Sequence, residues 1–292
     1  MNDIKVGKIA AVVVTFNRIE LLKKVINALR NQTKKLDQII VVNNSSTDGT
    51  LDWLNLQDDI ITVTQENLGS SGGQFAGAKT AFEMGFEWIW QMDDDVVADA
   101  DCLENLLKHA KKELICVPAR ITYQGNIFFA DFKKINLTNP IKTIRKRTTT
   151  NASDFQNEII SVEGFTFEGP IFHRNILEKI GFAEKNFFIY GDDTEYSVRA
   201  FKQNIKAAII KNAVLRRQLP FPNPEDEFIF DWKTYYMIRN MIAIDVLHGN
   251  FFVRLLRPFA YMFFWFSKCK KLNDVKTVLR AFKDAYFYKR SG

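Results

Sequence analysis

The first 92 residues alternate between short apolar runs and segments whose apolar residues recur at helical spacing. This alternation predicts a parallel β-sheet with helices on both faces. The runs are rich in Val, Ile and Ala and are apolar on both faces, as buried parallel strands are. The expected strands are residues 8–16, 38–44, 61–65 and 86–92. One helix is expected directly after a cap at Asn17, and two more are expected over about 50–56 and 73–85.

The second half of the chain has a less regular pattern. We interpret the polar, basic stretch 133–154 as a loop or a mobile lid, and the Pro-rich stretch 219–226 as a boundary. The fold class is therefore α/β, with a mixed, mainly parallel sheet and flanking helices over residues 1–217 and a helical, basic and aromatic extension over 218–292. The further expected elements are strands at 114–123, within 158–174 and at 206–217, and helices over 175–182 and from near Thr194.

Charge is unevenly distributed along the chain. Residues 232–292 contain 12 Lys/Arg and 3 Asp/Glu, and the other residues contain 28 and 31, so the net charge of +6 originates in the C-terminal segment. No recognised nucleic-acid motif accompanies this charge, so nucleic acid is not an expected partner. Three cysteines without metal or disulfide spacing, Cys102, Cys116 and Cys269, indicate a reducing compartment such as the cytoplasm. No uncharged apolar stretch reaches the roughly 18 residues of a transmembrane helix.

Three consecutive aspartates follow the fourth expected strand, in the stretch WIWQMDDDVV. Adjacent carboxylates at a strand end are hard oxygen ligands, which suit Mg²⁺ or Mn²⁺ held jointly with substrate phosphates. Residues i and i+2 leave an extended strand on the same side, so Asp93 and Asp95 are expected to address one ligand while Asp94 points elsewhere. An acidic turn that caps a helix is the alternative.

Polar clusters follow the other strands as well. In open α/β sheets, ligands bind beyond the carboxyl ends of the strands, so residues 15–18, 43–48 and 93–95 are expected to converge on one crevice. The Gly-rich stretch 69–77 has neither the ending of a P-loop nor the dinucleotide pattern, and we interpret it as a turn into a helix whose amides can face an anion or a sugar.

A second acidic cluster, GDDTEY, lies at residues 191–196. A carboxylate away from a metal can act as a general base and take a proton from a hydroxyl. The alternative is that these acids cap the helix that begins near Thr194. A crevice, an acidic strand end and a distant acid together predict transfer from a nucleotide diphosphate donor to a hydroxyl.

These stretches resemble the family 2 glycosyltransferases of the GT-A fold, over about residues 8–217 with a further match to about 240. Two of the stretches, 167–200 and WKTYYMIRN (232–240), resemble the galactofuranosyl- and rhamnosyltransferase branch. The motifs that carry the resemblance are VVVTFNR (12–18), VNNSSTDGT (42–50), NLGSSGG (67–73), MDDDV (92–96), the stretch 167–200 around FFIYGDDTEY, and WKTYYMIRN (232–240).

The resemblance implies an inverting, single-displacement transfer. It implies that Asp193 is the base with Asp192 as its neighbour, and that Asp94 and Asp95 approach the diphosphate and metal with Asp93 close by. Strand geometry favours Asp93 and Asp95 as the metal pair, and this choice stays open here. The residues expected at the nucleotide or donor are Thr15, Asn17, Arg18, Asn43, Asp48, Asn67, Gly69, Gly72, Asp93 and Asp94. Trp232, Tyr235, Arg239 and Asn240 are expected to border the acceptor or to steady the C-terminal helices.

The chain departs from the family pattern at two places. Many relatives have a metal-binding histidine after the strand equivalent to 206–215, where this chain has Arg216 and Arg217, and its three histidines, His109, His173 and His248, lie elsewhere. A divalent cation, Mn²⁺ or Mg²⁺, is the expected cofactor, with neutralisation of the diphosphate by an arginine as the alternative. Asn43 replaces a common aspartate, which leaves a UDP- or dTDP-linked donor open.

Residues 251–271 alternate bulky apolar residues with arginines and end in lysines. Such a segment is expected to lie in a membrane interface, and a core-facing helix or a dimer interface is the alternative. The expected function is transfer of galactofuranose or rhamnose to a glycan, free or lipid-linked, at the inner face of the cell membrane. The alternatives are a transferase using UDP-glucose, UDP-galactose or UDP-GlcNAc, a catalytically silent nucleotide- or glycan-binding protein, and a nucleotidyltransferase.

Overall fold

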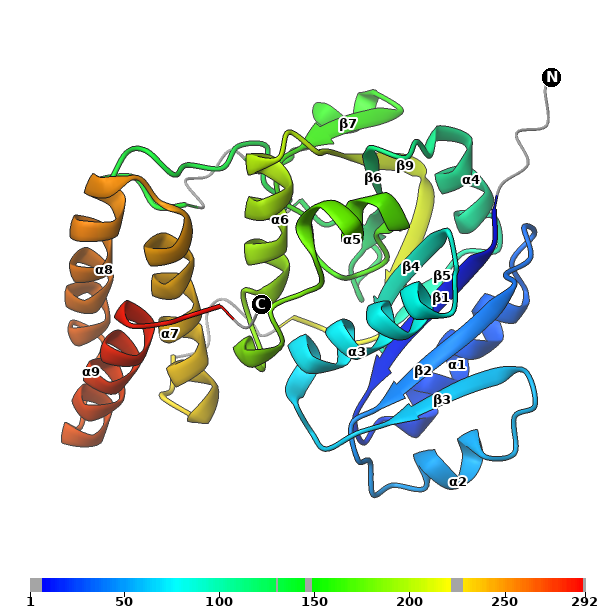
Figure 1. The fold of residues 1–292 in the computed structure, drawn as a ribbon, viewed down its shortest axis with the longest axis horizontal. Coiled ribbons are helices and arrows are strands. Elements are labelled where there is room, and N and C mark those ends of the chain that lie inside the picture. Colours follow the sequence, from blue (N-terminus) through cyan, green and yellow to red (C-terminus); the bar gives the residue numbers. More distant parts are fainter. Residues whose placement is uncertain (1–6, 130, 145–148, 222–227, 291–292) are drawn as a thin grey trace.

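The computed structural model describes residues 7–129, 131–144, 149–221 and 228–290. One sheet runs through the molecule in the order β3-β2-β1-β4-β8-β6-β9-β5, with β7 paired to β9 (Figure 1). The parallel strands at one end of this order are the ones that the sequence predicts. They are β1 (Ile9–Thr15), β2 (Gln38–Asn43), β3 (Ile60–Thr64) and β4 (Trp88–Asp93), connected by α1 (Ile19–Arg30), α2 (Thr50–Leu54) and α3 (Gly69–Glu83).

The start of α1 differs from the prediction. Asn17 does not cap this helix, because its backbone is left-handed (φ 52°) and its Oδ1 accepts a hydrogen bond from Thr47 N at 2.7 Å. Asp48, from the turn after β2, accepts from Ile19 N at 2.9 Å instead. The carboxylate that completes the first turn of α1 thus comes from the neighbouring strand end, which a local capping rule does not consider.

Helix α3 begins at Gly69, four residues before the predicted start. Its glycines allow the helix to pack closely on β1, since a Cβ at Gly73 would lie 2.3 Å from the Val14 side chain and one at Gly77 would lie 2.2 Å from Val12. The segment GSSG therefore forms the first helical turn, with its backbone amides at the carboxyl edge of the sheet.

The second half of the sheet is mixed, as predicted, because β8 is antiparallel to β4 and β6. Two elements were not predicted: a short strand, β5, directly after the three aspartates, and helix α4. The 133–154 stretch has no helix or strand within its described residues, apart from a single 3-10 turn that begins at Asp154. The elements are β5 (Val96–Ala98), α4 (Cys102–His109), β6 (Leu114–Ile121), β7 (Ile159–Val162), β8 (Ile171–His173), α5 (Arg174–Ile180), α6 (Asp192–Lys202) and β9 (Lys206–Arg217).

Three helices follow the sheet and form a layer beside α6 (Figure 1). The predicted helical extension is confirmed over its described residues; most of the Pro-rich boundary, 222–226, lies outside them. This layer has no core of its own, because Leu137, Ile144, Phe187 and Val198 from the preceding part are buried with it. The division at residue 217 stays a prediction. The helices are α7 (Trp232–His248), α8 (Phe251–Phe266) and α9 (Leu272–Tyr286).

The stretch expected to be a mobile lid is docked on this layer. Arg257, buried in α8, donates to the carbonyls of Asn136 and Asn139 at 3.0 and 2.9 Å and pairs with Asp245 at 2.6 Å. Asn250 Nδ2 donates to Thr138 O at 3.0 Å. These contacts hold the first part of the stretch as an ordered loop, although its sequence is polar.

Candidate active site

The ends of β1 and β4 meet at the Asp94 carboxylate. Thr15 Oγ1 donates to Asp94 Oδ2 at 2.7 Å, and Arg18 Nη1 lies 3.0 Å from Asp94 Oδ1. The same Arg18 nitrogen lies 3.3 Å from Asp95 Oδ2. Asp94 is buried, and its burial raises the pKa of its carboxyl while Arg18 and Thr15 oppose the rise. This is one charge-paired edge made by two adjacent parallel strands.

The turn after β2 completes this edge. Asn43 Oδ1 accepts from Ser46 N at 3.0 Å, and Asn17 N donates to Ser46 Oγ at 2.9 Å. The predicted convergence of the three strand ends is therefore confirmed. Asn43 Nδ2 is buried and has no hydrogen-bond partner among the described residues, so it is an unpaired donor at this edge. We refer to Thr15, Arg18, Asn43, Asp94 and Asp95 as the donor edge.

The three aspartates do not follow one extended strand. Strand β4 ends at Asp93, and Asp94 and Asp95 form the turn into β5. The two-residue alternation stops at this turn, so strand geometry no longer supports the choice of Asp93 and Asp95 as the pair that faces one ligand, and that choice stays a prediction. Asp94 and Asp95 share Arg18, whereas Asp93 Oδ1 accepts from Gln74 Nε2 at 3.1 Å.

The second acidic cluster lies against the first. Burial, followed by the charges of Asp95, Asp94 and Asp192, raises the pKa of Asp93 well above its usual value. Asp192 is about a hundred residues away in sequence, and helix α3 links the two clusters: Gln74 Nε2 donates to Asp93 Oδ1 at 3.1 Å, and Ser71 N donates to Phe188 O, shortly before Asp192, at 3.1 Å. Burial and the charge of Asp193 raise the pKa of Asp192 to about 7.

Asp193 is less buried than Asp192. Its Oδ1 accepts from Thr194 N at 2.5 Å and from Thr194 Oγ1 at 3.1 Å, but it lies inside the first turn of α6, whose N-cap is Gly191 and which has no side-chain cap. Both acids lie in the first turn of α6, directly after Gly191, whose φ is 81°. The pair is presented by a sharp turn at the start of a buried helix.

The loop before this acid pair is strained and held from α7. Phe188 and Tyr190 both have φ of 66°, which L-residues adopt at a cost. Asn240 Nδ2 donates to the carbonyls of Phe187, Ile189 and Tyr190 at 2.7–2.9 Å. Arg239 Nη2 donates to the carbonyls of Asn186 and Phe187 at 2.7 and 3.1 Å. We call residues 186–191 the base loop, and its conformation is fixed by two consecutive side chains of α7.

The base loop also touches the start of α3. Ser71 N donates to Phe188 O at 3.1 Å, and a Cβ at Gly69 would lie 2.0 Å from the same carbonyl. Asn67 Oδ1 accepts from Gly69 N at 3.0 Å, and Gly72 packs against the Leu68 side chain. The predicted donor residues Asn67, Gly69 and Gly72 thus shape the helix start that supports the base loop.

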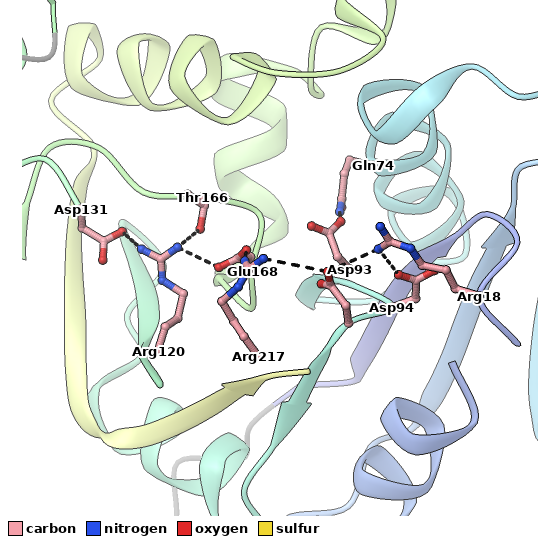
Figure 2. Close-up of polar contacts among 10 residues, drawn as sticks. Arg18, Gln74, Asp93, Asp94, Arg120, Asp131, Thr166, Glu168 and Arg217 are labelled. Atoms are coloured by element: carbon pink, nitrogen blue, oxygen red, sulfur yellow. Dashed lines mark hydrogen bonds and ion pairs between the residues drawn. The ribbon is translucent and has the colours of Figure 1, made fainter. Parts of the chain in front are cut away.

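A row of alternating charges extends from the donor edge into the protein (Figure 2). Arg217 Nη1 pairs with Glu168 Oε1, and Arg217 Nη2 lies 4.0 Å from Asp95 Oδ2. Arg120, fully buried in β6, pairs with Glu168 at 2.9 Å and with Asp131 at 2.6 Å. Arg120 also donates to Thr166 Oγ1 at 2.8 Å. The row joins the aspartate turn to Asp131, which lies two residues before the docked 133–144 loop.

The remaining predicted residues occupy different places. Arg216 pairs with Asp99 at 2.7 Å on the opposite face of β9, and its side chain is 52% exposed against 12% for Arg217. Trp232 is 58% exposed at the start of α7, and its ring centroid lies 6.0 Å from that of Phe188. Arg239 supports the base loop. Of these, Arg217 faces the acidic turn and Trp232 lies beside the base loop.

Sequence reasoning missed the residues that support the site. The signal for Arg120 is a lone charge in an otherwise apolar strand, LICVPARI, which requires a buried counter-charge. Glu168 lies within a stretch that the sequence analysis quoted, but its partners Arg120 and Arg217 are almost fifty residues away on either side. Gln74 lies within the Gly-rich stretch and was not singled out.

The acidic turn presents the hard oxygen ligands that a divalent cation prefers. Carboxylate oxygens are suitable ligands, but guanidinium nitrogens of Arg18 lie 3.0–3.3 Å from Asp94 and Asp95, and Arg217 adds a second positive charge beside Asp95. Among the described residues, no three His, Cys, Asp or Glu side chains are grouped so as to hold a metal ion. Within the part of the chain that the structure describes, the acidic turn, already paired with Arg18 and close to Arg217, therefore does not by itself fit a resident divalent cation. The predicted metal ligation by Asp93 and Asp95 stays a prediction.

Residues 10–181 match the family model of glycosyl transferase family 2, which is more than half of the chain. The chain belongs to glycosyl transferase family 2. The match covers the whole donor edge but ends at residue 181. The base loop, Asp192, Asp193 and Arg217 therefore lie beyond it. The predicted family resemblance is confirmed.

Curated relatives in this family include galactofuranosyltransferases GlfT1. The chain is 29% identical to the one from Mycobacterium tuberculosis over 203 residues, which are 67% of this chain and 65% of the relative. It is 26% identical to the one from Mycolicibacterium smegmatis over 204 residues, 68% and 66% of the two chains. The chain thus spans about two thirds of the length of these relatives. An undecaprenyl-phosphate mannosyltransferase from Micrococcus luteus is 23% identical over 184 residues, which are 55% of this chain and 74% of that relative.

Solved structures share the fold. GalNAc-T7 with UDP, GalNAc and Mn²⁺ superposes with a TM-score of 0.69 at 10% identity, over 97% of this chain and 56% of that chain. Residues 1–349 of S. aureus TarS with UDP-GlcNAc superpose with a TM-score of 0.58 at 14% identity, over 96% and 81%. The predicted GT-A fold, a mixed and mainly parallel sheet flanked by helices, is confirmed.

Proposed function

We propose that this family 2 protein is an inverting glycosyltransferase that moves a sugar from a nucleoside diphosphate to a glycan hydroxyl. The observation that carries the proposal is that helix α3 contacts both acidic clusters: Gln74 donates to Asp93, next to the charge-paired donor edge, and Ser71 donates to Phe188, in the loop that leads to Asp192 and Asp193. The two clusters supply the two groups that a single displacement needs, a binding site for the leaving diphosphate and a nearby base.

The donor edge accounts for nucleotide binding. The buried Asn43 Nδ2, which lacks a partner among the described residues, suits an acceptor atom of a nucleobase. Arg18 is half-exposed and carries donors that a phosphate oxygen can accept. Among solved neighbours, both the GalNAc-T7 and the TarS complexes were crystallised with a uridine nucleotide or its sugar, which favours UDP over dTDP as the first nucleotide to test.

Asp193 is the proposed base, and Asp192 is its buried neighbour. In the transfer, the acceptor oxygen attacks the anomeric carbon and Asp193 takes the hydroxyl proton. The bond between that carbon and the diphosphate oxygen breaks, and the nucleoside diphosphate leaves. Trp232, Phe188 and Tyr236 form an aromatic cluster beside the base loop, and such rings suit the apolar face of a sugar acceptor.

Galactofuranose is the proposed sugar and rhamnose the second candidate, because galactofuranosyltransferases are among the similar relatives. Incubation with UDP-galactofuranose, dTDP-rhamnose, UDP-glucose, UDP-galactose and UDP-GlcNAc tests this, with released nucleoside diphosphate as the readout. Release from one donor, dependent on a glycan acceptor, supports the proposal. Nucleotide binding without release from any donor would favour the silent binding protein.

A second proposal concerns the outer face of α8. No helix among the described residues is long and apolar enough to cross a membrane. Helix α8 nevertheless turns a broad apolar face outward, and it lies within the basic segment 232–292 of the sequence. We infer that this face lies in the interface of an anionic lipid surface, which both properties suit. The exposed residues of this face are Phe251, Phe252, Leu255, Leu256, Phe259, Phe263 and Phe264.

Vesicle co-sedimentation tests the membrane proposal. Removal of residues 251–292 is expected to lower binding, but it also removes Trp265 and Val278 from a shared core. The double substitution Phe252→Ser/Phe263→Ser changes exposed residues only and is the sharper variant. It is expected to bind phosphatidylglycerol vesicles several-fold more weakly, while Leu56→Ser, an exposed leucine after α2, binds as wild type. Equal binding by all three proteins would contradict the proposal, and with it the proposed place at the inner face of the cell membrane.

A further inference from the structure

Arg217 is a buried cation with one unpaired N–H group. It ends β9 opposite Val96, the residue that follows the aspartate turn. Its side chain is 12% exposed, and its Nε has no hydrogen-bond partner among the described residues. Its Nη2 lies 4.0 Å from Asp95 Oδ2, too far for a hydrogen bond. A positive charge with a free N–H thus lies next to the donor edge.

The guanidinium is held in one orientation. Glu168 binds its Nη1, and the Phe221 ring lies 4.1 Å from its Cζ. Phe221 stacks on Phe128 with centroids 4.5 Å apart, and Arg120 lies over the other ring at 4.7 Å. Two arginines are therefore fixed over two stacked rings, and Arg217 loses little entropy when it binds an anion.

The charge of Arg217 is only partly compensated. Glu168 is shared with Arg120, whose own position is fixed by Asp131 and Thr166 (Figure 2). Asp95 is shared with Arg18 at 3.3 Å, closer than Arg217. Arg217 therefore shares each of its carboxylate partners with another arginine, and its Nε, like that of Arg120, has no hydrogen-bond partner among the described residues, so it can turn toward an anion at the donor edge.

We propose that Arg217 is a built-in cation that binds the diphosphate of the donor, so that donor binding needs no divalent ion. The inference rests on the proposed function and deepens it. As the anomeric carbon–oxygen bond breaks, its electron pair goes to the diphosphate oxygen. Arg217 stabilises the negative charge on the leaving diphosphate through its N–H groups. Arg18, the other arginine beside Asp95, contributes a second positive charge. The acceptor proton goes to Asp193, so no further reactant is needed.

Calorimetric titration tests the proposal with UDP and UMP, each in Mn²⁺ and in EDTA. The wild-type protein is expected to bind UDP with the same affinity in both buffers. Arg217→Gln is expected to weaken UDP binding about 10- to 100-fold, the loss of one or two hydrogen bonds to a charged group, and to change UMP binding little. Arg216→Gln, which alters the next residue on the exposed face of the same strand, is the matched control and is expected to match wild type.

Each of the other outcomes contradicts either the Arg217 proposal or the proposed function. If EDTA weakens wild-type UDP binding tenfold or more, a metal serves the diphosphate and the Arg217 proposal fails while the proposed function stands. If Arg217→Gln and Arg217→Lys both bind UDP as wild type does, Arg217 has no role. If Arg217→Gln loses UMP binding equally, or melts far below wild type, its effect is structural and the proposal fails unless Arg217→Lys, which keeps the charge, restores UDP binding. If wild type binds neither UDP nor dTDP, the proposed function itself fails.

Discussion

The donor edge and the base loop are built in different ways. The donor edge consists of strand ends, and its contacts join Thr15, Arg18 and Asp94, which adjacent strands bring together. The base loop has three residues with positive φ, and carbonyl contacts from Asn240 and Arg239, about fifty residues later, hold it. Strand pairing alone forms the first, whereas the second depends on the C-terminal helices. Damage to α7 is therefore expected to affect catalysis and leave donor binding intact.

The largest expected effect is on the base side. Asp193→Asn removes the proposed proton acceptor, and turnover is expected to fall by about 10³-fold or more, within the usual range for general bases. The UDP dissociation constant is expected to stay within about threefold of wild type, because the donor edge is unchanged. Released UDP in a single-turnover assay measures the first quantity and calorimetry the second. Turnover equal to wild type would rule out Asp193 as the base.

Asp192 offers a pH-dependent test of the same side. Burial and Asp193 raise its folded-state pKa to about 7, so the folded protein holds this proton more tightly than the unfolded chain. The wild-type protein thus loses stability as pH rises from about 4 to about 7. Asp192→Asn removes this titrating carboxyl. The free energy of unfolding of the variant, relative to wild type, is therefore expected to increase with rising pH by up to about 1.4 kcal/mol per pH unit in this window. Denaturant unfolding at several pH values measures the slope, and parallel curves would mean that Asp192 ionises normally.

Asn240→Ala tests whether α7 positions the base. It removes three hydrogen bonds to the base loop, and the resulting displacement of Asp193 is expected to lower kcat about 10- to 100-fold with little change in UDP affinity. Asn250→Ala, which loses a helix cap and a contact to Thr138, is the matched control for general destabilisation. A fall in kcat that is equal in both variants would assign the effect to stability rather than to positioning.

Sequence reasoning succeeded where the structure is local. Buried strand patterns and the polar residues that follow them predicted the parallel strands and the convergence of residues 15–18, 43–48 and 93–95, although strand geometry had Asp94 pointing elsewhere. It failed where geometry depends on distant partners or on an abrupt turn. The Asp94–Asp95 turn ends the strand alternation, and no local signal marks it.

The same limit explains the other differences. Asp48 caps α1 from a neighbouring strand end, thirty residues away. Glu168 binds Arg120 and Arg217 from the middle of a segment between two strands, and only the folded sheet brings these three together. The polar 133–144 loop is ordered because a buried arginine of α8 binds its carbonyls. Each of these contacts joins residues that no periodicity relates.

The smallest expected effect lies on the donor side. Thr15→Val keeps the shape of the side chain in β1 but removes the hydrogen bond to Asp94 Oδ2. Arg18 still pairs with the other oxygen of that carboxylate, so the loss is expected to be about 1 kcal/mol, or about fivefold in the UDP dissociation constant, with kcat unchanged. Calorimetry and steady-state turnover measure the two quantities. A fall in kcat with normal UDP affinity would reverse the comparison, because it would mean that the donor edge acts on the chemical step and that Asp94 is more than a binding group.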